Sequence, residues 1–195
     1  MTGQCMAITH IDHIVFSSLK ASGALPPRPS VLELGEANWF GDIPTETLSE
    51  DIENLVADEA LREELHQRMA QILCEPEPDK VFNLAKLFYR IFLDYGKIVA
   101  IDLNGMPAAH KLDLNHPVDL GQQFDVLINT GTAEHVFNVF QFFKTSHDIT
   151  APGGIMIHTM PFRGWLDHGF FQFQPDFFLG PRRCQRLRGA AARAY

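Results

Sequence analysis

Short apolar runs alternate with stretches of helical periodicity along this chain. Three runs predict buried strands, at residues 31–34, 97–103 and 124–129, because they are rich in β-branched and other apolar residues and end at glycine, aspartate or asparagine. A fourth strand is expected at 155–161, after the turn Pro152-Gly153-Gly154, and a short one near 109–112. The pattern therefore predicts a sheet of about five strands.

Helical spacing of apolar residues fills the stretches between these runs. It predicts a helix over 10–20, two helices or one broken helix over 48–75, an almost wholly apolar helix over 80–94, and a helix from 132 to about 143. The expected helix-start signals are a capping box at Thr47-x-x-Glu50 and caps at Asp79 and Thr132. Alternating strands and helices favour parallel pairing. We expect an α/β, Rossmann-like fold, with 48–94 as a helical insertion after the first strand.

Length and composition indicate one globular domain over residues 1–180. The chain is 46% hydrophobic and 21% charged, as in ordinary globular proteins. No apolar run reaches the length of a membrane span, and the amino terminus lacks the basic region of a secretory signal. Three cysteines lie far apart without paired spacing. We expect a cytoplasmic protein with no membrane partner.

The charge of the chain is distributed unevenly. The whole sequence carries −8, but residues 181–195 hold five arginines and no acid, so the rest carries −13. An acidic body repels phosphate backbones, which argues against a nucleic-acid partner. Five arginines among alanines, without interleaved aromatic residues, are a weak nucleic-acid signal.

Candidate chemistry lies at the ends of the predicted strands. The first strand runs into Gly35, and the sequence Gly35-x-Ala37-x-x-x-Gly41 lacks the glycine spacing that cradles a pyrophosphate. Glu33 and Glu36 flank this turn, and their charges would repel phosphate but suit a ligand with an ammonium and a sulfonium. S-adenosylmethionine (SAM) is such a ligand. The simpler interpretation is that Gly35 only permits a tight turn.

Two aspartates follow later strands. Asp102 ends its strand, where a carboxylate can accept both hydroxyls of a ribose, although it lies 67 positions after Gly35. Asp113 is placed to receive an adenine amino group while Leu114 packs on the ring. Each aspartate has an alternative role as a turn or capping acid.

The loop after the fourth-strand candidate holds Asn129 and His135. Asn129 is expected near the transferable group, and His135 is a candidate general base because imidazole titrates near neutral pH. Alternatively, Glu134 and His135 only favour a helical first turn or contact the cofactor. The nine histidines raise the possibility of a metal, but no His-Glu-x-x-His or other close ligand spacing occurs, so scattered histidines are the favoured interpretation.

Five segments in this order resemble the class I SAM-dependent methyltransferases, in a bacterial branch whose substrates we cannot name. They are residues 31–35, 101–103, 112–115, 124–129 and the Pro-Gly-Gly turn within 151–157. The resemblance implies methyl transfer to a small-molecule acceptor, with orientation and desolvation supplying most of the rate. It assigns cofactor contact to Gly35, Glu36, Asp102, Leu103, Asp113, Leu114 and Asn129, with Glu33 supporting them from behind and His135 as the catalytic candidate.

The sequence departs from this family at two places. Ala37 replaces the second glycine, and bulky Trp39 follows it, which suggests that the tryptophan helps close the cofactor pocket. The family sheet has seven strands, the last two forming a hairpin, whereas here the composition changes at about Leu179 into an arginine-rich tail that resembles a truncated or frameshifted end. We expect residues 181–195 to be poorly ordered. The fifth strand would then form an exposed edge that could pair in a homodimer.

Three other functions are also compatible with the sequence. An NAD(P)-dependent oxidoreductase would use Asp102 in the same way but prefers more glycines and no Glu36 in the turn. A non-catalytic SAM-binding remnant would keep the cleft but lack activity. A metal-dependent enzyme would use the histidines.

Overall fold

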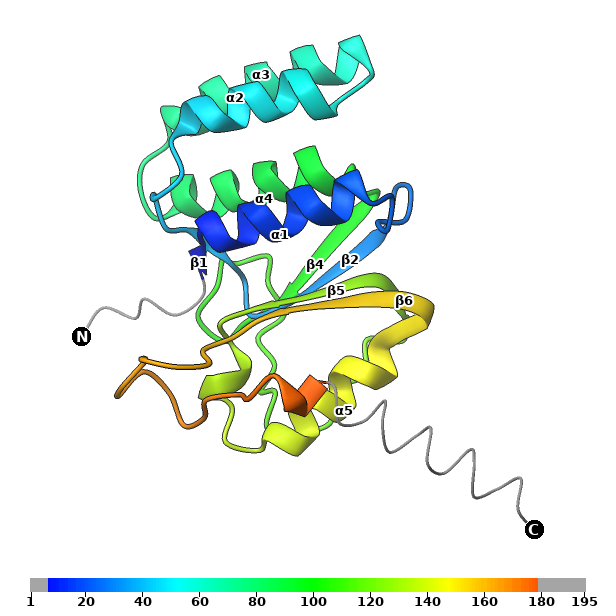
Figure 1. Cartoon of the computed structure of the whole chain (residues 1–195), viewed down its shortest axis with the longest axis vertical. Coiled ribbons are helices and arrows are strands. Elements are labelled where there is room, and N and C mark those ends of the chain that lie inside the picture. The colour runs from blue at the N-terminus through cyan, green and yellow to red at the C-terminus, as the bar shows by residue number, and fades with distance from the viewer. Residues whose placement is uncertain (1–6, 179–195) are drawn as a thin grey trace.

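A four-stranded parallel sheet forms the centre of the molecule (Figure 1). The computed structural model describes residues 7–178. The strands are β2 (Ser30–Leu34), β4 (Lys97–Ile101), β5 (Phe124–Thr130) and β6 (Thr150–Thr159), in the order β4-β2-β5-β6. This confirms the predicted α/β class with a Rossmann-like parallel sheet, although the main sheet has one strand fewer than expected.

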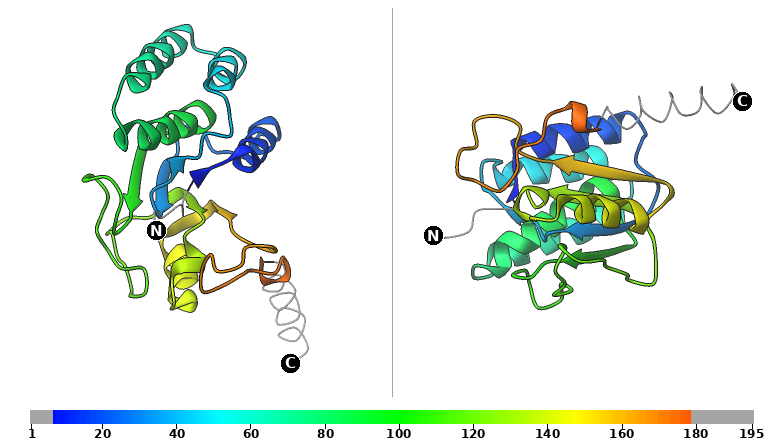
Figure 2. Two further views of the ribbon diagram at one scale, coloured as in Figure 1. Left: turned by 90° about the vertical axis from the view of Figure 1, so that its left-hand side faces the viewer. Right: turned by 90° about the horizontal axis from the view of Figure 1, so that it is seen from below.

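Helices cover both faces of the sheet and add a further layer on one side. Helices α1 (His10–Ala21) and α4 (Asp79–Leu93) cover one face, and α5 (Val139–Ile149) covers the other. Helices α2 (Thr45–Leu55) and α3 (Glu59–Leu73) form a hairpin that packs outside α4, farthest from the sheet (Figures 1 and 2). The expected helical insertion is therefore this outer hairpin together with α4.

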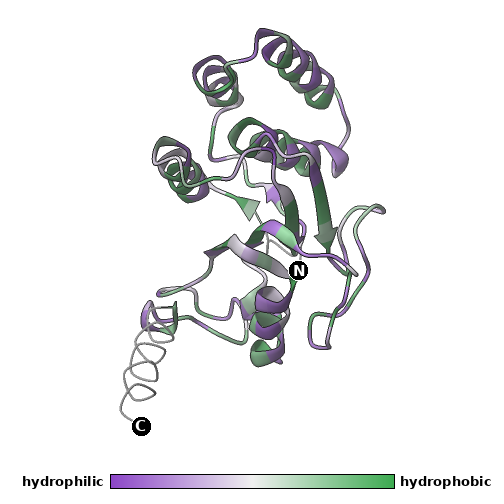
Figure 3. Cartoon of the chain, turned by 90° about the vertical axis from the view of Figure 1, so that its right-hand side faces the viewer, coloured by the Kyte–Doolittle hydropathy of each residue, from purple (hydrophilic) through white to green (hydrophobic). Residues whose placement is uncertain are grey.

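Alternating side chains of the strands pack into two hydrophobic cores, one on each face of the sheet. Val31 of β2 packs with α1 and α4, whereas its neighbours Leu32 and Leu34 pack with α5. This alternation follows from the two-residue period of a strand, and burial on both faces explains why the two central strands, β2 and β5, are largely apolar. Figure 3 shows the contrast between these hydrophobic strands and the hydrophilic stretches of α2 and α3.

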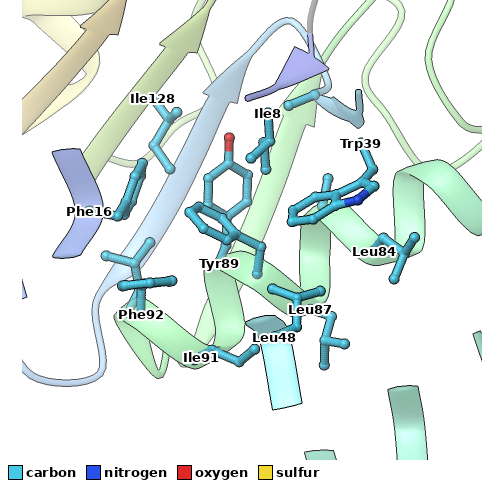
Figure 4. Close-up of a cluster of buried hydrophobic side chains, with 14 of the residues drawn as sticks. Ile8, Phe16, Trp39, Leu48, Leu84, Leu87, Tyr89, Ile91, Phe92 and Ile128 are labelled. Atoms are coloured by element: carbon cyan, nitrogen blue, oxygen red, sulfur yellow. The ribbon is translucent and has the colours of Figure 1, made fainter. Parts of the chain in front are cut away.

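Helix α4 is buried, as its apolar sequence predicts. The Phe88 ring lies 5.3 Å from Phe16, 4.7 Å from Phe92 and 6.0 Å from Trp39, all measured between centroids. Figure 4 shows Phe16, Trp39 and Phe92 in this hydrophobic cluster. Phe88 and Phe92 are wholly inaccessible to solvent. Trp39, expected at a cofactor pocket, belongs to this core, where its side chain is also buried.

Several predicted boundaries were wrong for local reasons. Residues 109–112 make only one bridge, between Ile101 and His110, rather than a strand. The capping box at Thr47 is absent because α2 already begins after Pro44, and Asp79 is the first residue of α4, after Pro78, not its cap. A separate two-residue pair, β1 (Ala7–Ile8) with β3 (Asn38–Trp39), was not expected.

The helix predicted from Thr132 begins later. Its first part is a short 3-10 helix, η1 (Ala133–His135), and the α-helix α5 starts after Asn138, whose side chain accepts a hydrogen bond from Gln141 N at 3.3 Å. Phe137 precedes this start and Phe140 lies in the first turn of α5, and their side chains are 72% and 76% exposed.

The predictions for the carboxyl-terminal part of the chain concern the arginine-rich tail and the edge strand β6. The arginine-rich tail, 181–195, lies outside the described residues. Within residues 7–178, β6 is the outermost strand on its side of the sheet, and no helix is long and apolar enough to cross a membrane. Strand β6 starts at Thr150, so the Pro152-Gly153-Gly154 segment lies within its span, at an irregularity in its register with β5.

Candidate functional site

The order of the strands creates a switch point between β2 and β5. The chain leaves β2 to form β4 on one side, then returns past β2 to form β5 on the other. In open α/β sheets, ligands bind outside the carboxyl ends of the strands at such a point. A glycine with positive φ follows each strand there, Gly35 at 83° and Gly131 at 71°. Their amides bond to neighbouring chain ends, Gly35 N to Ile101 O and Gly131 N to Thr159 O, both at 2.8 Å.

An acid cluster lies directly behind the first glycine. It consists of Glu33, Glu36 and Asp102 together with Lys86 of α4, and we call it the β2 acid cluster. The buried carboxylate of Glu33 accepts hydrogen bonds from Lys86 Nζ and from Ala37 N, the latter at 3.2 Å. One lysine thus serves two glutamates, because Lys86 Nζ also lies 3.1 Å from Glu36 Oε1.

The Asp102 carboxylate ties the glycine turn to the end of β4. Its Oδ2 accepts from Glu36 N at 2.8 Å, and its Oδ1 accepts from Asn104 N at 2.7 Å. Met106 N donates to Glu36 Oε2 at 2.7 Å, which closes the loop after β4 over the cluster. A Cβ on Gly105 would lie 2.5 Å from that Glu36 oxygen and 2.9 Å from Asp102 Cβ, so this close approach requires glycine.

Burial and charge pairing act in opposite directions on this cluster. Burial raises the pKa of Glu33, although the Lys86 ammonium acts to lower it. Burial acts to lower the pKa of Lys86, but the charges of Glu33 and Glu36 outweigh it, so that pKa is raised. Lys86 therefore stays protonated. Because the cluster has three acids and one lysine, its net charge at this strand end is negative.

The remaining residues predicted on the β4 side lie in different surroundings. Leu103, directly after Asp102, exposes 57% of its surface. The Asp113 carboxylate accepts from Asn115 N at 2.9 Å and Asn115 Nδ2 at 2.8 Å, and these bonds lower its pKa. Leu114 is buried in the core beneath α5. Thus Gly35, Glu36, Asp102 and Leu103 lie together, Leu114 is packed inside, and the cofactor roles of all of them stay predictions.

Asn129 is wholly buried and bonded on both sides of its amide. Its Oδ1 accepts from Thr132 N at 3.1 Å and Ala133 N at 3.2 Å, and its Nδ2 lies 3.2 Å from His158 Nδ1. Burial lowers the pKa of His158 to about 4, so the ring is neutral and its Nδ1 can accept that bond. Asn129 holds the turn that leads into η1.

A second group of polar residues lies on η1 and the loop after β6. It contains Glu134, His135 and His168, which we call the Glu134 cluster. Glu134 is wholly buried, and its carboxylate accepts no hydrogen bond from residues 7–178. The nearest imidazole nitrogens to its Oε1 are His168 Nε2 at 3.6 Å and His135 Nε2 at 4.0 Å. Burial raises the pKa of Glu134 to about 7, and burial and the nearby His168 lower that of His135.

The loop after β6 is fixed to η1 through the backbone of Glu134. Phe170 N donates to Glu134 O at 2.7 Å, and Phe171 N donates to the same oxygen at 3.3 Å. Figure 1 shows this loop, in orange, returning from β6 toward α5. Sequence reasoning missed His168 as a partner of Glu134, because the two are 34 positions apart and no short spacing motif connects them.

The sequence matches no protein-family model and no curated protein. The functional conclusion therefore depends on the sequence pattern and on the geometry of the strand ends.

Proposed function

We propose that this chain binds SAM at the carboxyl edge of its sheet and transfers the methyl group to a small-molecule acceptor. The observation that carries the proposal is the switch point between β2 and β5, with Gly35 and Gly131 directly after the two strands. The geometry of the switch point indicates where a ligand would lie. The chemistry around it explains which ligand is favoured.

The charge of the β2 acid cluster fits a cationic ligand. The cluster holds three carboxylates and one ammonium, that of Lys86, which pairs with Glu33 and Glu36, so a pyrophosphate would be repelled, while an ammonium and a sulfonium would be attracted. Both Asp102 oxygens already accept one backbone N–H each, but a carboxylate oxygen has a second lone pair. Asp102 would accept the ribose hydroxyls through these remaining lone pairs.

The apolar contact would come from the residue after Asp102. Leu103 exposes 57% of its surface beside the strand end, where it can pack on an adenine ring. Asp113 keeps 43% of its side chain exposed and can accept the adenine amino group. When bound, SAM supplies an electrophilic methyl group on its sulfonium.

This chain's own contribution would be orientation and, for some acceptors, proton removal. Asn129 fixes the turn from β5 into η1, which places His135 near the ends of the strands. Burial lowers the pKa of His135, so the imidazole is neutral at pH 7 and able to accept a proton from an acceptor hydroxyl or amine. We therefore keep His135 as the proposed general base.

Calorimetric titration of SAM into the full chain tests the proposal, with NADH as a parallel ligand. Leu103→Asp should weaken SAM binding at least about tenfold, or ~1.4 kcal/mol, because it replaces the adenine contact with a charge. Ile14→Asp is the matched control, since Ile14 is 54% exposed on α1 and is not part of the β2 acid cluster. Asp102→Asn, which keeps one acceptor oxygen, should also weaken binding.

Other outcomes separate the alternatives. Binding of NADH in place of SAM would support the oxidoreductase. Binding of SAM without methyl transfer to any of a broad set of acceptors would support a non-catalytic remnant. No binding by the folded chain would remove the proposed function.

Two further parts of the proposal concern the setting of the protein. We propose that it acts in the cytoplasm, where the exposed thiol of Cys74 would stay reduced. We also propose that the outer edge of β6 can pair with a second copy, because an edge strand presents unpaired backbone groups. Sedimentation velocity over a range of concentrations would detect such a dimer.

A further inference from the structure

The Glu134 carboxylate is buried without a hydrogen-bond partner among the described residues. Its exposure is 0%, and neither oxygen accepts a hydrogen bond from residues 7–178. A buried charged group without a partner is costly, and most buried polar atoms in folded proteins have one. The side chain therefore indicates a ligand that supplies the missing interaction.

Two imidazoles lie beside this carboxylate and identify the ligand class. The rings of His135 and His168 are 4.9 Å apart, measured between centroids, and their Nε2 atoms lie 4.0 and 3.6 Å from Glu134 Oε1. One ligand atom from each of the three residues lies within 4.8 Å of the others. The distances of 3.6 and 4.0 Å exceed the length of a hydrogen bond, so these imidazole nitrogens do not satisfy the Glu134 carboxylate directly.

We infer that Glu134, His135 and His168 bind a divalent first-row transition-metal ion. This site shares His135 with the proposed methyl transfer, and a His135 ring that binds a metal would not act as the general base. The inference itself does not depend on methyl transfer, because it rests on the geometry of the three side chains and is tested without SAM. Donors about 2.0–2.2 Å from a tetrahedral metal lie about 3.3–3.6 Å from one another. The two histidine nitrogens are 3.6 and 4.0 Å from Glu134 Oε1, and the three ligand atoms lie within 4.8 Å of one another, so side-chain shifts of about an ångström close the site. Two histidines and one carboxylate suit zinc, iron or cobalt and leave coordination positions open for water or a ligand oxygen.

The backbone around the three residues is built to hold them together. Asn129 fixes the start of η1, and two hydrogen bonds from Phe170 N and Phe171 N fasten the His168 loop to Glu134 O. A Cβ on Gly169 would lie 2.8 Å from that same oxygen, so glycine allows the loop to approach this closely. The two ligand-bearing segments, far apart in sequence, are thus joined independently of any metal.

Other histidine–acid pairs in the described chain lack this arrangement. His13 Nε2 lies at an ordinary 2.8 Å from Asp51 Oδ2, and His66 Nε2 lies 2.7 Å from Glu53 Oε1. Each of those carboxylates already has its hydrogen bond, and within residues 7–178 only the Glu134 cluster brings three metal-binding side chains this close. The combination of three donors and an unpartnered carboxylate distinguishes the site.

The test is metal titration of the full chain after removal of metals by a chelator. We expect Zn²⁺ to bind with one tight equivalent in calorimetry, and Co²⁺ to give visible d–d absorption bands. Glu134→Gln and His168→Ala should each weaken binding at least about tenfold, because each removes a ligand. His147→Ala is the matched control, since the His147 side chain is 81% exposed and lies outside the cluster.

A thermal-unfolding measurement keeps the test decisive. Zinc should raise the unfolding temperature of the wild type and of His147→Ala but not of Glu134→Gln, since a ligand stabilises only the state that binds it. If His168→Ala does not fold, His168→Gln replaces it. Absence of Zn²⁺ and Co²⁺ binding by the folded wild type, or equal binding by folded Glu134→Gln, would overturn the inference.

Discussion

The β2 acid cluster and the Glu134 cluster both contain buried carboxylates on segments near the ends of the strands, but the carboxylates differ in their hydrogen bonds. Glu33 and Glu36 bind a shared lysine, and each also accepts a backbone N–H, as does Asp102 on both oxygens. Glu134 has no hydrogen bond within residues 7–178. The first cluster is internally satisfied and holds the glycine turn, whereas the Glu134 carboxylate of the second cluster offers acceptor oxygens to which a ligand could bind.

The largest expected effect comes from removing the shared lysine of the β2 acid cluster. Lys86→Met should lower the free energy of unfolding by about 3–5 kcal/mol, because it leaves two buried glutamates without their charge partner. Urea denaturation near neutral pH measures the change.

Lys144→Met is the matched control, since Lys144 forms an exposed ion pair with Asp148 and its loss should change stability little. Equal losses in the two variants would mean that the cluster is not a coupled buried network.

The neutral ring of His158, which bonds to Asn129, makes stability depend on pH. Burial lowers its pKa from 6.5 to about 4, so between these values the unfolded state binds more protons than the folded one. The contribution is complete above pH 6.5 and falls by about 3 kcal/mol as the pH drops from 6.5 through 4.

His158→Asn should flatten this pH dependence, since an amide oxygen can still accept from Asn129 but does not titrate in this range. Urea unfolding from pH 7.5 to 4 measures both slopes. Identical slopes for the variant and the wild type would contradict the assignment to His158.

A smaller loss of stability should follow from adding a side-chain carbon at Gly105, where the loop after β4 packs closely on the β2 acid cluster. Gly105→Ala places a Cβ within 2.5 Å of Glu36 Oε2 and 2.9 Å of Asp102 Cβ, so the loop must move away. We expect a loss of about 1–3 kcal/mol in unfolding free energy.

Gly121→Ala serves as a comparison, because its φ is positive but no atom would meet the added Cβ within 4 Å. It therefore reports the cost of backbone strain alone. If Gly105→Ala is no worse than Gly121→Ala, the packing argument fails.

The smallest effect, and the opposite sign, is expected at the unsatisfied carboxylate. In metal-free protein above pH 7, where the Glu134 carboxyl is mostly ionised, Glu134→Gln should raise the free energy of unfolding by about 1 kcal/mol, because it removes a buried charge that accepts no hydrogen bond from residues 7–178. Added Zn²⁺ should reverse the order by stabilising only the wild type. A clear loss of stability in the metal-free variant would show that the charge already has a partner.

Local sequence predicted the parts of the fold that local chemistry determines. Four apolar runs gave the four strands, and the all-round apolar pattern of 80–94 gave the buried helix α4. The start of α5 was misplaced because the Asn129 side chain binds Thr132 N and Ala133 N and holds a 3-10 turn there. A side chain at the end of one strand thus decided where the next helix begins.

At the candidate sites, too, the sequence predicted neighbouring strand ends but not contacts between distant segments. The neighbouring positions of Gly35 and Asp102 could be predicted, since carboxyl ends of parallel strands share one edge of a sheet. The pairing of Lys86 with Glu33 depends on how α4 packs, and the contact of His168 with Glu134 depends on a loop returning from β6. Neither contact leaves a spacing signal in the sequence.

The central claim is that SAM binds at the switch point between β2 and β5, and amide NMR spectra of the ¹⁵N-labelled full chain test it most directly. The account predicts that SAM shifts the signals of Gly35, Leu103 and Gly131 while leaving those of the α2–α3 hairpin unchanged. Unchanged strand-end signals at saturating SAM, or shifts confined to α2 and α3, would contradict it.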